Sequence, residues 1–197
     1  MNYLAHAYLS FNNEEILVGN LISDFVKGKK KLNYPEGIQK GIVLHRAIDT
    51  FTDTHEATKM AKNIFRPHYR LYGGAFVDVV YDHFLATDVS EFTEEALHSF
   101  SQKVYNTLDH YEDYLPERFA RMFPYMKMQN WLFNYRTMNG TESSFGGIVR
   151  RAAYLSESRT AALLFGQHYK TLHQYYQSFF PDLKSFAFRM FEDIIKL

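Results

Sequence analysis

Apolar side chains recur at helical spacing along this chain, and that periodicity constrains its fold more than any other feature. Strict alternation of apolar and polar residues over a strand's length is absent. Helix-start signals appear at Pro35, Thr54, Thr93-Glu94-Glu95 and Pro181-Asp182. Over residues 34–51 the periodic apolar positions are Ile38, Ile42, Leu44, Ile48 and Phe51. The sequence therefore predicts an all-α fold, an irregular helical bundle.

The breaks between the predicted helices are short enough to be turns within one domain covering residues 1–197. They are expected at Lys27–Tyr34, Pro67–Gly73, Pro116 with Pro124, Asn139-Gly140 and Phe180-Pro181. The predicted helices are Tyr3–Ser10, Glu14–Val26, Glu36–Phe51, Glu56–Phe65, Gly74–Thr87, Glu94–Tyr114, Met126–Tyr135, Ser143–Tyr154, Thr160–Phe179 and Asp182–Lys196.

Composition excludes several classes of protein. With 46% hydrophobic residues, 15 Tyr and 18 Phe, the chain is too apolar to be disordered. Lys plus Arg equals Asp plus Glu at 22 each, so we expect neither nucleic acid nor a membrane surface as partner. Cysteine is absent, so any metal must be bound through nitrogen and oxygen. No secretion signal or membrane-spanning run is evident, and we expect a soluble, cytoplasmic protein.

Histidines and aspartates lie at helical spacing inside two predicted helices. His45 and Asp49 are four residues apart and project from one side of the 36–51 helix, and Asp53 follows four residues later. Asp78 and Asp82 repeat that spacing in the 74–87 helix, with His83 directly after them. Both helices therefore carry a ridge of side chains suited to binding a cation.

Two further polar residues lie in apolar surroundings near the amino terminus. They are His6 and Asp24, and a lone ionised carboxylate there is costly unless it is paired or bound to metal. Imidazole and carboxylate together suit manganese, magnesium, iron or zinc. A divalent ion would activate water and polarise a phosphoryl oxygen, and Arg46 is placed to steady phosphate charge.

Structural roles compete with this interpretation. Each histidine or aspartate taken singly is more often a hydrogen-bonded structural residue than a ligand. Asp49 and Asp53 could pair with Arg46 or end a helix, and Asp78 could lie on a solvated helix face. The basic run Lys27–Lys31 and the pair Arg150-Arg151 with Arg136 are either binding patches for acidic partners and phosphate or ordinary surface charges.

Four blocks of sequence resemble one family in content and order. They are Met1-Asn-Tyr-Leu-Ala-His6, Gly19-Asn-Leu-Ile-Ser-Asp-Phe-Val-Lys-Gly28, Gly41-Ile-Val-Leu-His-Arg-Ala-Ile-Asp49 with Thr52-Asp53, and Asp78-Val-Val-Tyr-Asp-His-Phe-Leu85. With these blocks the chain resembles the acyl carrier protein phosphodiesterases, also called acyl carrier protein hydrolases, over most of its length. The second half matches more loosely, through Trp131-Leu132 and Tyr135-Arg136.

The resemblance implies a reaction and a fold. The reaction is hydrolysis of holo acyl carrier protein to apo acyl carrier protein and 4'-phosphopantetheine, with a divalent cation, typically manganese, with magnesium or iron as alternatives. The fold it implies is a divergent relative of the HD-type phosphohydrolases, although this chain reads Asp82-His83 where those enzymes read His-Asp.

The residues and the resemblance together give a hypothesis for the site. The metal set is His6, Asp24, His45, Asp49, Asp82 and His83; the catalytic set is Asp24, His45, Arg46 and Asp49; Asp53 and Asp78 are supporting candidates. Two alternatives stay open: a phosphohydrolase of the same kind acting on a nucleotide or other small phosphoester, and a non-enzymatic helical binding module whose buried polar residues satisfy one another.

Overall fold

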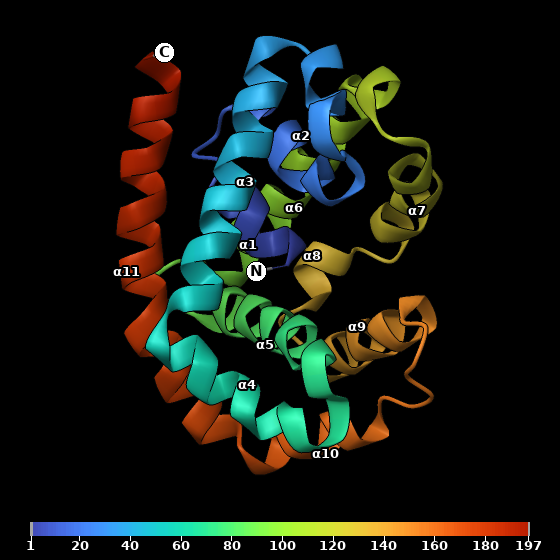
Figure 1. Cartoon of the computed structure of the whole chain (residues 1–197), viewed down its shortest axis with the longest axis vertical. Coiled ribbons are helices and arrows are strands. Elements are labelled where there is room, and N and C mark those ends of the chain that lie inside the picture. The colour runs from blue at the N-terminus through green and yellow to red at the C-terminus, as the bar shows by residue number, and fades with distance from the viewer. Residues whose placement is uncertain (1, 197) are drawn as a thin grey trace.

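The computed structural model describes residues 2–196, and every regular element in that range is a helix (Figure 1). The all-α prediction is therefore confirmed. The α-helices are α1 (Tyr3–Tyr8), α2 (Glu14–Ile22), α3 (Glu36–Thr54), α4 (Glu56–Tyr69), α5 (Gly73–Thr87), α6 (Glu94–His110), α7 (Glu117–Met128), α8 (Trp131–Asn134), α9 (Met138–Arg151), α10 (Arg159–Gln167) and α11 (Tyr169–Lys196). Short 3-10 helices cover Ser23–Phe25, Gly28–Asn33, Arg70–Tyr72 and Glu112–Tyr114.

Several predicted breaks are wrong because helices continue through them. Pro67 lies inside α4, Pro124 inside α7 and Pro181 inside α11, and Gly140 lies inside α9. A proline within a helix costs about 3 kcal/mol. In α11 the buried side chains on both sides of Pro181 offset that cost through core packing, and one helix replaces the two predicted ones. They are Phe179, Phe180, Leu183 and Ala187.

Other boundaries also differ from the expectation. Helix α7 was not predicted as a separate element, and the predicted helix Thr160–Phe179 is divided at His168. In Figure 1, α11 runs along the outside of α3 and α4, with which it is in contact. Its apolar face closes that side of the bundle.

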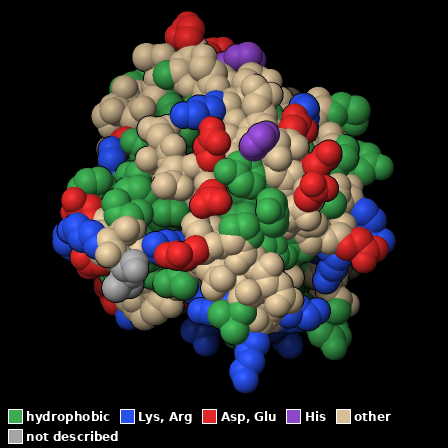
Figure 2. All heavy atoms as spheres, turned by 90° about the horizontal axis from the view of Figure 1, so that it is seen from above, with side chains coloured by type: hydrophobic (Ala, Val, Ile, Leu, Met, Phe, Trp, Pro, Cys, Tyr) green, Lys and Arg blue, Asp and Glu red, His purple; other side chains and the backbone are tan. Residues whose placement is uncertain are grey.

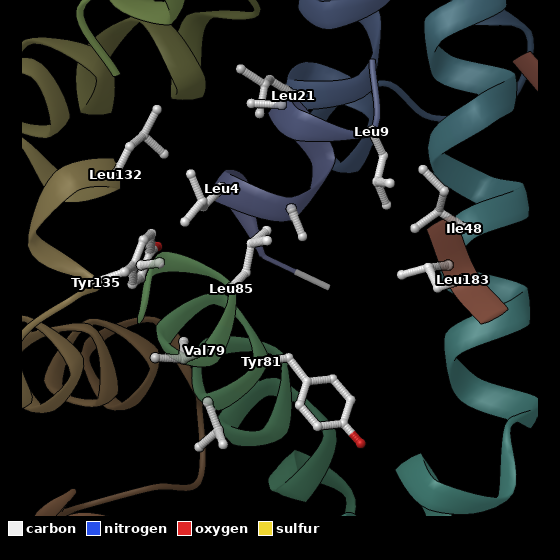
Figure 3. Close-up of a cluster of buried hydrophobic side chains, with 14 of the residues drawn as sticks. Leu4, Leu9, Leu21, Ile48, Val79, Tyr81, Leu85, Leu132, Tyr135 and Leu183 are labelled. Carbon is white, nitrogen blue, oxygen red and sulfur yellow. The ribbon is translucent and has the colours of Figure 1, made fainter. Parts of the chain in front are cut away.

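The core is one connected cluster of buried apolar and aromatic side chains contributed by the described helices except the short 3-10 segments. Figure 3 shows Leu4, Leu85 and Leu132 converging from α1, α5 and α8. Each is fully buried, and burying a leucine contributes roughly 1.5–3 kcal/mol. Helix α1, only six residues long, is therefore held by its surroundings rather than by its own propensity.

Two glycines let α2 and α3 approach unusually closely. A Cβ on Gly19 would lie 2.0 Å from the Ile38 carbonyl oxygen, and one on Gly41 would lie 2.2 Å from the Ile16 carbonyl oxygen. No real side chain tolerates such contacts. This close crossing brings the backbone that follows Gly19 against the side of α3 that carries His45.

The surface carries charges of both signs. Acidic and basic side chains are interspersed on the face shown in Figure 2, as the equal numbers of the two in the sequence lead one to expect. Among the helices of residues 2–196, none combines the length and the apolar character that a membrane span requires.

Candidate metal centre

Four of the predicted site residues meet at one place in the fold. His6 comes from α1, Asp24 from the 3-10 turn that follows α2, and His45 and Asp49 from successive turns of α3. The Nε2 atom of His45 lies 3.0 Å from Asp49 Oδ2 and 3.2 Å from Asp24 Oδ1. The Nε2 atom of His6 lies 3.2 Å from Asp49 Oδ1. The Asp49 carboxylate thus bridges the two imidazoles.

The two imidazole rings are stacked. Their centroids are 4.0 Å apart with an interplanar angle of 16°, and the Nε2 atom of each ring lies within 3.2 Å of an Asp49 oxygen. Donor atoms of His6, His45 and Asp49 all lie within 4.8 Å of one another. Both histidines are buried, whereas the side chains of Asp49 and Asp24 are 39% and 76% exposed. The centre therefore has a buried wall of imidazoles and a carboxylate rim open to solvent.

Asn20, a residue the sequence analysis did not select, fixes both rings. Its side-chain nitrogen donates to the backbone oxygen of His6 at 2.8 Å and to Ser10 Oγ at 3.1 Å. Its side-chain oxygen must then face His6 Nδ1, 2.7 Å away, and its backbone oxygen faces His45 Nδ1 at 2.7 Å. The hydrogen-bond network assigns a hydrogen to Nδ1 of each ring.

This assignment leaves the Nε2 lone pair of neutral His6 facing a carboxylate oxygen. Nε2 of His6 is buried and has no hydrogen-bond partner, although Asp49 Oδ1 is only 3.2 Å away. Two lone pairs at that distance repel unless a cation or a proton lies between them. A buried polar atom without a partner is rare in folded proteins and calls for a ligand.

The electrostatics of the cluster are strongly coupled. Burial, aided by the charge on His45, lowers the pKa of His6 to about 4. Burial also opposes the charge on His45, but hydrogen bonds to Asp24 and Asp49 outweigh it and raise the pKa of His45 to about 9. Burial would raise the pKa of Asp49, but the imidazoles of His45 and His6, each within 3.2 Å of a carboxylate oxygen, hold it far below its usual range. In the metal-free protein, protonated His45 therefore interacts with two carboxylates, those of Asp24 and Asp49.

A divalent cation fits this set of donors. Two neutral imidazole nitrogens and carboxylate oxygens are borderline and hard ligands, of the kind used for manganese, iron, zinc or magnesium. Hydrogen bonding of each Nδ1–H to a protein oxygen is the usual way in which ligating histidines are oriented. The centre therefore has the ligand chemistry and the support that a metal site requires.

Arg46 lies beside the centre, at the rim. It is exposed, and its Nη2 atom donates to the backbone oxygen of Val26 at 3.1 Å, two residues beyond Asp24. The guanidinium thus leans over the turn that carries the Asp24 carboxylate. Hydrogen bonding from His45 lowers the pKa of Asp24 despite burial, so this carboxylate is ionised.

The supporting candidates Asp53 and Asp78 occupy different places. Asp53 is on the last turn of α3 and forms an exposed ion pair with Lys62 Nζ at 2.6 Å. Asp78 is half-buried on α5, where burial raises the pKa of its carboxyl group. Neither belongs to the group of donors that surrounds His45.

Asp82 and His83 have structural partners away from that group. Asp82 is fully buried and accepts hydrogen bonds from the backbone N–H groups of Leu4 at 2.7 Å and Ala5 at 3.2 Å. It therefore caps the amino terminus of α1. The Nδ1 atom of His83 is 2.8 Å from the Tyr135 backbone oxygen, and Nε2 is 2.9 Å from the Tyr169 hydroxyl. Helix α5 thus positions α1, which carries His6.

The basic residues singled out from the sequence are dispersed. Lys27, Lys29 and Lys30 are exposed at the short 3-10 helix after Asp24. Arg136 is paired with Glu94 at 3.1 Å. Arg150 and Arg151 end α9.

Comparison with known proteins gives a consistent result. The family model described as acyl carrier protein phosphodiesterase matches residues 1–183. Curated relatives named acyl carrier protein phosphodiesterase include one from Enterobacter sp. with 32% identity, covering 92% of this chain and 94% of its own. Those from Salmonella paratyphi A and Photorhabdus laumondii share 31% and 30% identity, over 96% and 92% of this chain and 98% and 92% of theirs. No solved structure matches significantly. The chain belongs to the acyl carrier protein phosphodiesterase family.

Proposed function

We propose that this protein is a metal-dependent phosphodiesterase that hydrolyses holo acyl carrier protein to apo acyl carrier protein and 4'-phosphopantetheine. The observation that carries the proposal is the buried Nε2 atom of His6, which has no hydrogen-bond partner and faces the carboxylate that also binds His45. The names of the relatives support the substrate. The fold would then be a divergent form of the HD-type phosphohydrolases, acting in the cytoplasm.

His6, His45 and Asp49 would hold the cation, and Asp24 would complete the set from the rim. When bound, a divalent ion of this kind, manganese in our proposal with magnesium or iron as alternatives, lowers the pKa of water and polarises a phosphoryl oxygen. Asn20 keeps both imidazoles in the tautomer that offers Nε2. Asp82, with His83 next to it in the chain, contributes indirectly by holding α1 in place, and Asp78 lies four residues earlier on α5.

The exposed Asp24 carboxylate is ionised and open to the substrate, so it can accept a proton from the attacking water. The water oxygen forms a bond to phosphorus as the bond between phosphorus and the serine oxygen breaks. The serine oxygen leaves with a proton, and the pantetheine arm keeps the phosphate. Arg46 at the rim stabilises charge on the phosphoryl oxygens.

Intact-mass analysis of holo acyl carrier protein tests the proposal. We expect the protein with manganese to remove the phosphopantetheine arm, and we expect no loss with a chelator or with Asp24→Ala. Full activity in Asp24→Ala would exclude this residue from the mechanism. Failure of the wild-type protein to act, while it binds manganese, would reject the carrier protein as substrate in favour of another phosphoester.

A further inference from the structure

A pocket of about 210 Å³ lies between the start of α1, the segment around α8, and α9. Its walls are the aromatic rings of Tyr3 and Trp131, amide and hydroxyl groups that include Asn134 and Ser143, and the side chains of Arg150 and Arg151. No aspartate or glutamate is among the described residues that line it. The pocket is therefore positively charged and rich in hydrogen-bonding groups.

The two arginines lack acidic partners. Within residues 2–196, no ion pair involves Arg150 or Arg151, whereas nearby Arg136 is paired with Glu94. Arg151 Nη1 lies 3.8 Å from Met122 Sδ, and the Tyr3 hydroxyl lies 3.6 Å from the same sulfur. Arg151 is thus at the end of the pocket that adjoins α1. Unpaired guanidinium groups beside a cavity are suited to a phosphate ester.

The pocket adjoins the metal centre through α1. Tyr3 precedes His6 by three residues, so the two side chains lie on neighbouring positions of one helix face. The Tyr3 ring packs edge-on against Phe119 at 6.4 Å, and Phe119 packs against Phe25 at 5.4 Å. Phe25 directly follows Asp24. The Phe119 ring therefore lies between Tyr3 of the pocket and Phe25 of the turn that carries Asp24.

We propose that this pocket receives the 4'-phosphopantetheine arm of the substrate, an inference that rests on the proposed function. The arm carries a phosphate and two amide groups on a flexible chain. After the bond to the serine oxygen breaks, Arg151 at the α1 end binds the phosphate that stays on the arm. The chain lies against Trp131, and its amides face Asn134 and Ser143. Selectivity for a pantetheine ester over other phosphodiesters then comes from this pocket, because the metal centre does not itself distinguish them.

Gly147 offers a way to fill the pocket without disturbing α9. It lines the cavity, and a Cβ there would meet only Arg150 Nη2, at an ordinary contact distance of 3.7 Å. Gly147→Leu therefore occupies the space that the arm would take. Gly166→Leu is the matched control, because nothing lies within 4 Å of a Cβ at that helical glycine on α10.

Calorimetric titration of the metal-free protein with 4'-phosphopantetheine is the test. We expect binding by wild-type protein and Gly166→Leu, and binding at least about tenfold weaker by Gly147→Leu and Arg151→Gln. Pantetheine without phosphate and inorganic phosphate alone should each bind at least about tenfold more weakly than the complete arm. No binding of 4'-phosphopantetheine by wild-type protein, or equal binding by Gly147→Leu, would overturn the assignment.

Kinetics separate this inference from the proposed function. We expect Gly147→Leu to lose hydrolysis of holo acyl carrier protein while keeping manganese-dependent hydrolysis of bis(4-nitrophenyl) phosphate, which needs only the metal centre. Unchanged kcat and KM for the carrier protein in Gly147→Leu would reject the pocket and retain the activity. Binding of the arm to this pocket by a wild-type protein that never cleaves the carrier would retain the pocket and reject the activity.

Discussion

Two pairs of histidine and aspartate differ in their exposure to solvent and in their hydrogen-bond partners. On α3, Asp49 is partly open to solvent, and its carboxylate contacts both buried His45 and His6, whose buried Nε2 atom lacks a hydrogen bond. On α5, Asp82 and His83 are buried, and their polar atoms bond to the backbone or to a tyrosine hydroxyl. Identical residue types form a candidate ligand set in one place and a closed hydrogen-bond network in the other.

The balance of hydrogen-bond donors and acceptors distinguishes a binding site from other buried polar residues. Around Asp82 each hydrogen bond joins a donor to an acceptor, so the fold itself completes the network. Around His45 acceptors outnumber donors, because two carboxylates and two imidazole lone pairs face one another across about 3 Å. Only a cation or added protons relieve that excess, and the excess marks the site.

The comparison is tested most directly by Asp49→Asn, with Asp53→Asn as control one helical turn away. The amide keeps the shape of Asp49 but loses the charge that binds a cation, so we expect turnover to fall by more than roughly 100-fold together with loss of manganese binding. Asp53 is exposed and pairs with Lys62, so its substitution should change activity little. Mass analysis of the carrier protein measures turnover. Equal loss of turnover in Asp49→Asn and Asp53→Asn would show that Asp49 has no special role.

Asp82→Ala should affect stability rather than chemistry. It leaves the buried N–H groups of Leu4 and Ala5 without acceptors, and we expect the free energy of unfolding to fall by about 3 kcal/mol. Urea unfolding measures this loss. At a temperature where the variant is folded, its affinity for manganese should fall far less than that of Asp49→Asn, because only the anchoring of α1 is weakened. A variant of normal stability that fails to bind metal would instead make Asp82 a ligand.

Asn20→Ala should weaken metal binding because His6 loses the side-chain oxygen that orients its ring, whereas the backbone oxygen that orients His45 remains. Removing such a supporting partner typically costs 10–100-fold in affinity, and we expect a loss of about that size. Asn13→Ala, which removes the exposed cap of the same helix, is the control. Competition with a fluorescent chelator gives the affinities, and wild-type affinity in Asn20→Ala would contradict the role assigned to Asn20.

The pKa of His45 predicts opposite pH trends with and without metal. In metal-free protein its folded pKa of about 9 exceeds the unfolded value near 6.5. Its contribution to stability is therefore complete below pH 6.5 and is lost as pH rises through 9. Manganese must displace this proton, so apparent affinity should rise about tenfold per pH unit between those limits. Calorimetry in buffers of different ionisation enthalpy should detect about one proton released at pH 8; no release would show that His45 is already neutral.

The smallest effect is expected for Tyr169→Phe. The change removes the hydroxyl that contacts Nε2 of His83, a bond of 2.9 Å, and should lower the free energy of unfolding by about 1 kcal/mol without altering turnover. Tyr154→Phe, at an exposed tyrosine, should change neither quantity. Loss of metal-dependent activity in Tyr169→Phe at full stability would move His83 into the catalytic machinery.

Sequence periodicity predicted the helices well where local signals agreed with packing. The bounds of α5 differ from the prediction by one residue, and α3 extends only three residues further. Prediction failed at Pro67, Pro124 and Pro181, where a local rule favours a break and burial of neighbouring side chains overrides it. The division at His168 was also missed, because the glycine near it, Gly166, lies inside α10 rather than at the break.

The residues of the site likewise divide into those that local spacing predicts and those that only the fold brings together. Spacing four residues apart on one helix placed His45 and Asp49 together from the sequence alone, because an α-helix returns to the same face after about four residues. Asp78 and Asp82 have the same spacing, but Asp82 caps α1, and no neighbouring residue in the sequence indicates that role. Asn20 was overlooked because a single asparagine in an apolar helix gives no chemical signal until its four partners are known.

The sequence by itself determined the helical class, the ridge of His45 and Asp49, and the absence of thiolate chemistry, since these depend on composition and on neighbours within one helix. Which distant residues lie beside His45 and Asp49 depends instead on the tertiary structure. His6 and Asp24 reach them because Gly19 and Gly41 let α2 press against α3 and because Asp82 anchors α1. Those contacts span up to 78 residues of chain, and their geometry follows from packing of the whole core rather than from any local preference.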